Sequence, residues 1–269
     1  MAGALARAQP GGTWERGMSP TRRVVALDLG TARTRSLALS GHAIADRPSV
    51  ITGRASGVAE VVRPIRHGMV ADPGACLRLV RLVLRDIRHY DGRPPALVLT
   101  GVPIAASPSD RRAVHAAVSE IAGCEVTLVE EPLAAAVGAG LDVLDPRPCL
   151  VLDVGAGIVE AVAIGGGAAV DAVSLQLGAT TAAGLPPYAL ESVVDMTAGL
   201  LRRLPTASRS RGLVVTGGGA RQEQLLSRLR AALRLPIDVA PQPQHATIRG
   251  LMRLCLQPAL ADGLGLRAR

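Results

Sequence analysis

The sequence contains no lysine, no asparagine and no phenylalanine, and it has only one tryptophan and two tyrosines among its 269 residues. Arginine therefore supplies all of the basic side-chain charge, and the net charge is +8. A basic balance is compatible with contact to nucleic acid or to an anionic membrane. Single-stranded nucleic-acid sites, however, use aromatic side chains as stacking platforms, which this chain nearly lacks. We therefore expect no nucleic-acid partner.

The chain also lacks closely spaced cysteine pairs and long apolar runs. Zinc ribbons and thioredoxin-type sites need a CxxC pair, and none occurs. Free, buried thiols in a reducing cytoplasm are the better interpretation. No uninterrupted apolar run is long enough to cross a bilayer, and the N-terminus has no apolar core of a secretory signal. The four cysteines are Cys76, Cys124, Cys149 and Cys255.

What the chain does contain is a strand pattern broken by a glycine-rich turn at residues 150–164, LVLDVGAGIVEAVAI. Asp153 ends the first apolar run, and Gly155 and Gly157 permit a tight turn because glycine reaches backbone angles that other residues avoid. Backbone N–H groups in such a turn can face phosphate oxygens, and the carboxylate can hold a hydrated Mg²⁺. Taken alone, the pattern fits an ordinary β-hairpin better than a phosphate site.

A second copy of the pattern occurs at residues 24–39, VVALDLGTARTRSLAL. Asp28 matches Asp153, and Gly30 matches Gly155, with apolar strand residues on both sides of each pair. Internal similarity of this kind indicates a repeated architecture. Two halves that each offer a strand, an aspartate and a glycine turn could hold one phosphate chain from both sides.

The rest of the chain alternates between predicted helices and strands, which favours an α/β fold in one large or two modest domains. Residues 1–23, including Trp14 and Met18, are expected to be a flexible leader, and residues 41–63 to be irregular. A third glycine turn, 217–219, stands between a strand and a helix, where a ligand can approach the backbone closely. Apolar periodicity, together with a capping-box signature at residues 107–110, predicts helices at 73–89, 107–122, 133–140, 186–204 and 222–233 and strands at 96–100, 125–129 and 213–216. The three glycines at 165–167 predict a hairpin turn.

The motifs of this chain, and their order along it, resemble those of the MreB/Mbl family of bacterial actin-like proteins over most of residues 24–256. The resemblance implies an actin-like ATPase fold with two related domains, 24–148 and 149–269, and a nucleotide cleft between them. The segments that carry it are 28–32 (first phosphate motif), 63–72 (the segment that follows), 130–140 (the catalytic stretch, with Glu-Glu-Pro), 153–157 (second phosphate motif) and 216–220 (adenosine motif).

The resemblance also assigns roles to single residues. Asp28 and Asp153 are implied to organise Mg²⁺ through water, and Glu131 to position the water that attacks ATP in a weak ATPase reaction. For Glu131 the alternative is a solvated carboxylate that only stabilises a helix N-terminus. The residues implied to contact ATP are Gly30, Thr31, Ala32, Arg33, Gly155, Ala156, Gly157, Ile158, Gly217, Gly218, Gly219 and Ala220.

The chain departs from the family pattern in its loops and in its length. Arg33 stands where the family usually has asparagine, and Ala156 replaces a loop glycine. Apolar residues replace hydroxyl side chains at 158 and 159. The stretches 48–63 and 183–212 are shorter than the family's two small upper subdomains.

The function implied by the resemblance is that of an ATP-binding cytoskeletal protein in cell-shape or cell-wall morphogenesis. Its expected partners are other actin-like protomers, full-length family members, and the cell-wall-synthesis or membrane morphogenesis proteins. Its expected location is the cytoplasm, at the inner face of the plasma membrane, with peripheral membrane contact. Two alternatives stay open: a degenerate, nucleotide-free actin-fold scaffold, and another ATPase or kinase of the actin-like superfamily.

We predict that the purified protein polymerises poorly on its own, even with ATP. In the family, the region equivalent to 183–212 builds much of the longitudinal contact, and a filament needs a complementary surface at both ends of each protomer. A stable interface usually buries about 1,200–2,000 Å² in total, and the residues left in this stretch are too few to supply their share. Robust sedimentation and straight filaments from this protein alone in a pelleting assay would contradict the prediction.

Overall fold

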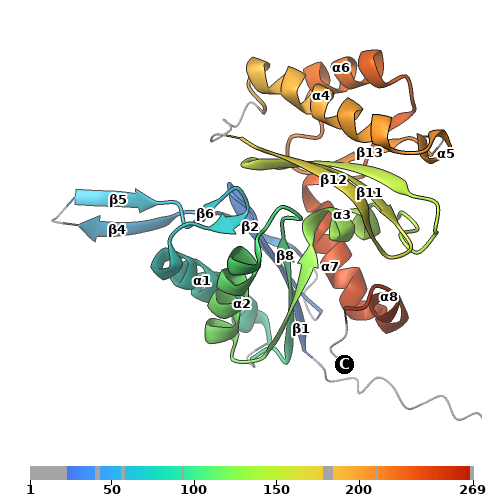
Figure 1. Cartoon of the computed structure of the whole chain (residues 1–269). Helices are drawn as coiled ribbons and strands as arrows, with labels where there is room; N and C mark the ends of the chain where they lie inside the picture. The colour runs from blue at the N-terminus through green and yellow to red at the C-terminus, as the bar shows by residue number, and fades with distance from the viewer. Residues whose placement is uncertain are drawn as a thin grey trace, which may run out of the picture.

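The computed structural model describes residues 23–39, 43–55, 58–91, 94–177, 184–209 and 211–266. Trp14, Met18 and the rest of the expected leader, except Arg23, lie outside these ranges. Two five-stranded sheets form the two halves of the molecule, with helices on their outer faces and two further helices between them (Figure 1).

The first sheet has the strand order β3-β2-β1-β8-β9. β1 pairs with β2 in antiparallel fashion, as the hairpin prediction requires, and pairs with β8 in parallel on its other side. β9 extends the sheet in parallel beside β8. These strands are β1 (Val24–Leu29), β2 (Arg33–Ala38), β3 (Ala45–Pro48), β8 (Leu97–Val102) and β9 (Glu125–Glu130).

The second sheet repeats this arrangement, with the order β12-β11-β10-β13-β14. β10 and β11 form the antiparallel hairpin, and β13 and β14 lie in parallel beyond β10. The internal repeat predicted from the two aspartate–glycine turns is therefore a repeat of whole-sheet connectivity. These strands are β10 (Cys149–Val154), β11 (Ile158–Gly165), β12 (Ala168–Gln176), β13 (Leu213–Thr216) and β14 (Ile237–Val239).

The prediction that residues 41–63 are irregular is wrong. β3 lies there, together with β4 (Ile51–Ala55) and β5 (Val58–Val62), which form a separate two-stranded hairpin. A second small hairpin, β6 (Ile65–Arg66) and β7 (Met69–Val70), follows it. These strands are short, and backbone pairing to a neighbour holds β3 on the edge of the first sheet although its side chains are half-buried or exposed. Apolar alternation, the signal that predicts strands, is therefore weak in this segment.

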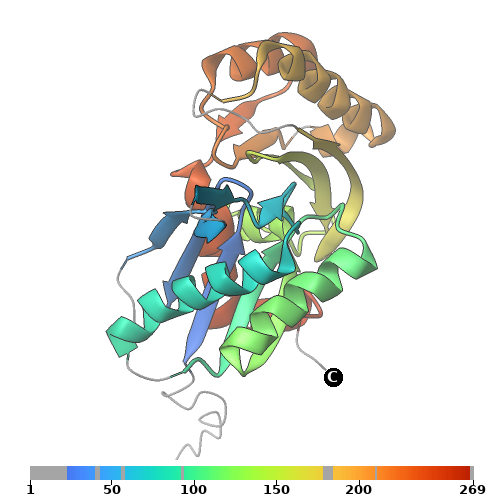
Figure 2. The same cartoon turned by 90° about the vertical axis from the view of Figure 1, so that its left-hand side faces the viewer.

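The outer face of each sheet is covered by a helix pair. Figure 2 shows α1 (Pro73–Asp91) and α2 (Pro108–Ala122) lying across the first sheet. The predicted capping box is present, because the Ser107 hydroxyl accepts from the Asp110 N–H while the Asp110 side chain accepts from the Ser107 N–H. Asp72 caps α1 by accepting from the Ala75 N–H at 2.8 Å. The predicted helices here are thus confirmed.

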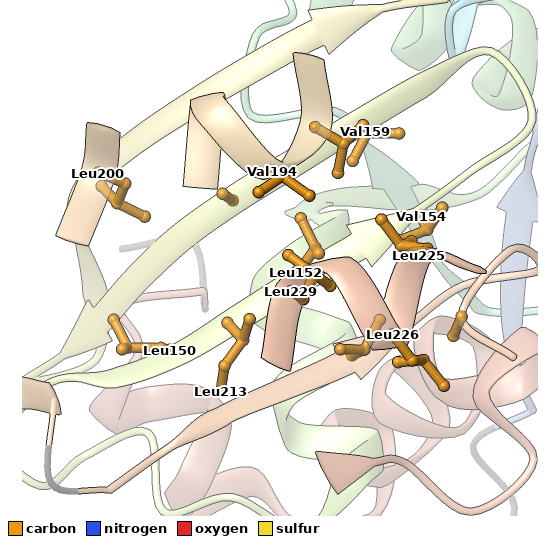
Figure 3. Close-up of a cluster of buried hydrophobic side chains, with 14 of the residues drawn as sticks. Leu150, Leu152, Val154, Val159, Val194, Leu200, Leu213, Leu225, Leu226 and Leu229 are labelled. Carbon is orange, nitrogen blue, oxygen red and sulfur yellow. The ribbon is translucent and has the colours of Figure 1, made fainter. Parts of the chain in front are cut away.

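The second sheet packs in the same way against α4 (Pro187–Arg203) and α6 (Glu223–Leu233), with the single-turn α5 (Thr206–Arg209) between them in sequence. Figure 3 shows Leu150 and Leu152 of β10 in a cluster with Val194 of α4 and Leu225 of α6. With no phenylalanine in the chain, branched aliphatic side chains fill this core. All four cysteines are free, and two of them, Cys76 and Cys149, are buried.

Two helices run between the sheets, and one of them, α3 (Glu131–Ala139), is the chain's connection from the first sheet to the second. α3 leads from β9 to β10, and α7 (Ala246–Leu256) follows β14 after the short η1 (Pro243–His245). α7 packs against β1, β8 and α3, and α8 (Pro258–Gly263) follows it. The division of the chain at residue 148 stays a prediction. No described helix has the length and apolar character needed to span a membrane.

α3 and α7 approach so closely that their backbones touch. A Cβ atom added at Gly138 of α3 would overlap the Ala246 carbonyl group, and one added at Gly250 of α7 would overlap the Ala134 carbonyl group. Side chains from the inner faces of both sheets, such as Leu99 and Val151, surround this crossing. The crossing therefore fixes the distance between the two halves.

We expect Gly250→Ala to lower the free energy of unfolding by about 1–3 kcal/mol, the usual cost of overpacking a core. Gly199→Ala in α4 is the matched control, because its Cβ would come no closer than 3.7 Å to the Arg202 side chain. Replacing an unstrained helix glycine should stabilise the protein by about 0.4–1 kcal/mol. Urea unfolding of both variants measures the difference, and equal effects would show that the helices can move apart freely.

Candidate functional site

The two aspartate–glycine turns line one cleft of about 280 Å³ between the sheets. Residues from the third glycine turn, from the start of α3 and from the start of α7 complete its wall. The structure thus brings together predicted site residues that are far apart in the chain. The predicted residues that line the cleft are Asp28, Gly30, Thr31, Ala32, Arg33, Glu131, Asp153, Gly155, Ala156, Gly157, Ile158, Gly217, Gly218 and Gly219.

Ala220 is the one predicted contact residue that does not line the cleft. Its side chain is fully buried in the hydrophobic core of the second sheet, among residues of α4 and α6. The turn changes direction at Gly219, whose N–H donates to the Val154 carbonyl oxygen at 2.9 Å. The expected contact of Ala220 with ATP is therefore corrected to a packing role.

The two predicted phosphate turns have the same local geometry. A Cβ at Gly30 would lie 2.7 Å from the Arg33 carbonyl oxygen, and a Cβ at Gly155 would lie 2.7 Å from the Ile158 carbonyl oxygen. Any side chain at either position would collide with the backbone three residues later. Glycine is thus required at the equivalent place in both turns, which is the reason that the sequence repeats there.

The turn between β6 and β7 joins the two phosphate turns. The Gly68 N–H donates to the Thr31 hydroxyl at 2.9 Å, and His67 Nδ1 lies 2.6 Å from the Gly157 carbonyl oxygen. Both His67 and Gly68 have positive φ, 50° and 72°, so the chain turns tightly enough to reach both partners. This small hairpin therefore sets the relative position of the turns across the cleft.

Asp28 and Asp153 are the last residues but one of equivalent strands and are 6% and 7% exposed. Burial raises the pKa of Asp28 to about 6, opposed by the nearby guanidinium of Arg35. Burial also raises the pKa of Asp153, although a 2.8 Å hydrogen bond from the Thr216 hydroxyl acts in the opposite direction. Both carboxyl groups are thus held at the cleft in positions where a cation would stabilise their charged forms.

Glu131 is the first residue of α3 and is buried, which rules out the alternative of a solvated carboxylate. Its Oε1 atom is among the few buried side-chain polar atoms in the described ranges without a hydrogen-bond partner. Burial raises its pKa well above the usual value, and the charge of Asp28 adds to the effect. The neighbouring Glu130 is the more accessible acid and pairs with Arg111 at 3.1 Å. A buried acid left without a partner is costly, so a ligand role for Glu131 is favoured.

Sequence reasoning missed two charged residues of this region. Arg35 lines the cleft, with Nη1 3.4 Å from Asp28 Oδ2. Glu160 of β11 is 1% exposed and accepts hydrogen bonds from the backbone N–H groups of Ile104 and Ala105, each at 3.2 Å, so that it joins the second sheet to the loop after β8. A charged residue inside an otherwise apolar strand was the available signal for Glu160. Gln244 and Thr247, near the start of α7, also line the cleft and were missed.

The residues present fit a nucleotide and a cation held mainly through water. The glycine turns leave no room for side chains between the backbone segments, and Gly218 faces open space, with no atom within 4 Å of an added Cβ. Within the described ranges, no group of three His, Cys, Asp or Glu side chains could hold a metal ion. Asp28 and Asp153 could hold a hydrated Mg²⁺, which commonly takes its remaining ligands from water and phosphate oxygens.

Comparison with known proteins gives a family match and distant relatives. The family model described as MreB/Mbl protein matches residues 23–182. The cell shape-determining protein MreB of Escherichia coli strain K12 is 28% identical over 178 residues, which cover 57% of this chain and 51% of that protein. The chain thus spans about half the length of this relative.

Solved structures show the same fold at low sequence identity. MreB5 of Spiroplasma citri bound to ADP superimposes with a TM-score of 0.78 at 19% identity, covering 91% of this chain and 99% of that chain. The MamK double helical filament matches with a TM-score of 0.69 at 18% identity, covering 87% of this chain and 99% of that chain. These likenesses confirm the predicted actin-like α/β fold.

We expect Glu160→Gln to flatten part of the pH dependence of stability. Burial raises the pKa of Glu160 from 4.5 to about 7. An acid with a raised folded-state pKa stabilises the fold below pH 4.5, and this contribution is lost as the pH rises through about 7. Between acidic and slightly alkaline pH, the free energy of unfolding should therefore fall on the order of 2 kcal/mol more in the wild type than in the variant.

Chemical denaturation at several pH values checks this expectation. The Glu160→Gln side chain has one acceptor oxygen where the carboxylate has two, so it loses one of the two bonds from the Ile104 and Ala105 N–H groups. That loss is the same at every pH, so it does not change how the free energy of unfolding varies with pH. Glu120→Gln on the exposed side of α2 is the matched control and should follow the wild-type profile. Parallel profiles for wild type and Glu160→Gln would show that Glu160 titrates normally.

Proposed function

Because the chain belongs to the MreB/Mbl family, we propose that it is an actin-like nucleotide-binding protein that acts in cell-shape or cell-wall morphogenesis. The observation that carries the proposal is the convergence of two equivalent aspartate–glycine turns and the buried Glu131 on one cleft. A scaffold without a ligand would gain nothing from burying three acids around a cavity, since burying a charged group lowers stability unless its partners compensate fully.

The nucleotide would lie across the cleft with its phosphates between the two hairpin turns. Backbone N–H groups of the two turns would donate to phosphate oxygens, since the family's hydroxyl side chains are absent at 158 and 159. The Gly155 N–H is not among them, because it already donates to the Ile158 carbonyl oxygen at 3.0 Å. The adenosine would lie beside Gly217–Gly219, where the cleft wall carries no side chains. MreB5 of Spiroplasma citri, which shares the fold, is bound to ADP, and this supports nucleotide binding by analogy.

Asp28 and Asp153 would hold Mg²⁺ through water, and the cation would supply charge neutralisation to the phosphates. Glu131 would orient the attacking water through its Oε1 atom, which has no protein partner. Since phosphoryl transfer depends mostly on positioning and charge stabilisation, this carboxyl group and the cation together would support a slow ATPase reaction.

The protein would assemble with other actin-like protomers, including full-length family members, and meet cell-wall-synthesis proteins at the inner membrane face. The filament of MamK, which shares the fold, supports an assembly role by analogy. Between α4 and β13 this chain has only residues 204–212, with the single-turn α5 among the described ones. A full-length partner would therefore provide the contact surface that this short connection does not.

We expect ATP or ADP with Mg²⁺ to raise the melting temperature. A ligand that binds only the folded state raises the free energy of unfolding by about 2.7 kcal/mol at a hundredfold excess over its Kd. For a chain of this size that corresponds to a shift of roughly 5–10 °C. Absence of any shift with millimolar nucleotide would favour the nucleotide-free scaffold.

Two isosteric variants separate binding from hydrolysis. Asp153→Asn should reduce the shift given by Mg-ATP, since Asp153 acts on the bound cation and nucleotide. Glu131→Gln should keep the shift but lower ATP turnover by about 10²-fold or more, because it removes an interaction made in the transition state. Equal loss of affinity in both variants would contradict these roles.

A further inference from the structure

Three adjacent strands place an arginine between two carboxylates at the edge of the cleft. In the sheet register, Arg35 of β2 lies opposite Asp28 of β1 on one side and opposite Asp46 of β3 on the other. Arg35 Nη1 is 3.4 Å from Asp28 Oδ2, and Arg35 Nε is 3.2 Å from Asp46 Oδ2. Arg33 lies two residues earlier on the same face of β2, with Nε 2.6 Å from Asp46 Oδ1.

Asp46 orients both guanidinium groups toward the cleft. Its carboxylate accepts from the Nε atoms of Arg33 and Arg35, and its carbonyl oxygen accepts from Arg33 Nη2 at 3.2 Å. Each guanidinium has five N–H donors, so these bonds leave donors of both arginines for a ligand. Both arginines line the cleft, and their side chains are 44% (Arg33) and 13% (Arg35) exposed.

The bond between Arg35 and Asp28 is long for a charged pair. At 3.4 Å it lies near the outer limit of hydrogen-bond geometry, whereas charge-assisted N–H bonds to carboxylates are usually about 2.7–2.9 Å. Arg35 is therefore weakly held on this side. A fixed positive charge at this distance from Asp28 also opposes the approach of a divalent cation to the same carboxylate.

We propose that Arg35, oriented by Asp46 and assisted by Arg33, binds the phosphate groups of the nucleotide directly, so that nucleotide binding does not require a divalent cation. This inference rests on the proposed nucleotide function of the cleft. A guanidinium matches the geometry of phosphate oxygens with two parallel N–H bonds and remains charged when it is partly buried. The phosphate takes the side of Arg35 that faces Asp28, while Asp46 keeps its bond to Nε.

The test measures the affinity of ADP and ATP by titration calorimetry, in buffer with MgCl₂ and in buffer with EDTA. The wild type should bind in both buffers. Arg35→Met should weaken binding in EDTA by about tenfold or more, the effect of losing a charge-assisted contact. In MgCl₂ the same variant should recover most of its affinity, because Asp28 is then free to act on the cation.

Arg47→Met is the matched control, since Arg47 lies on β3 and pairs with Asp86 at 2.9 Å, and it is not part of the cleft wall. Its affinities should equal those of the wild type in both buffers. Melting curves without nucleotide establish that each variant is folded. Arg35→Gln, which can still donate to Asp28 but carries no charge, serves as the second test of the same expectation.

The outcomes separate the inference from the proposed function. Failure of the wild type to bind in either buffer would overturn the nucleotide function itself. Binding in MgCl₂ but not in EDTA would overturn the inference and leave the nucleotide function intact. Wild-type affinity of both Arg35 variants in EDTA would show that the backbone turns, and not Arg35, bind the phosphates.

Discussion

The contact between α3 and α7 at Gly138 and Gly250 sets the geometry on which the cleft depends. α3 connects the first sheet to the second, α7 follows the last strand of the second sheet, and each begins at the cleft: α3 with Glu131, and α7 with Thr247 in its first turn. Because their backbones touch, no side chain separates the two halves at this point. The aspartates of the two hairpins can therefore face one ligand only while this crossing stays closed.

The cleft between the two sheets brings several buried acidic side chains close together, which is electrostatically unfavourable. Asp28, Glu131, Asp153 and Glu160 are all less than 10% exposed, and burial raises the pKa of each. Arg35 is the cation that offsets part of this charge. Such a cluster lowers the stability of the unliganded fold, which is the usual relation between a binding site and the scaffold that holds it.

The sequence was most informative where backbone conformation or periodicity determines residue type. The turns at Gly30 and Gly155 were predictable because no other residue fits there, and the helices because their apolar faces repeat. Arg35 and Glu160 were not recognised, since their partners are fixed by strand register and by a loop of the other sheet. Ala220 was wrongly predicted to contact ATP because the adenosine motif covers the consecutive residues 216–220. The chain leaves the cleft and enters the core before the motif ends. β4 and β5 were missed because backbone pairing, and not an apolar pattern, defines them.

Because the basic side chains of the cleft wall are arginines and the chain has no lysine, the positive charge of the wall is constant and only its acids change the electrostatic potential with pH. The guanidinium groups of the wall do not lose their protons. Its acids, in contrast, have raised pKa values, about 6 for Asp28, and so gain protons under mildly acidic conditions. As the medium becomes more acidic, the wall can therefore only become more positive, and its attraction for anions can only grow while the fold persists.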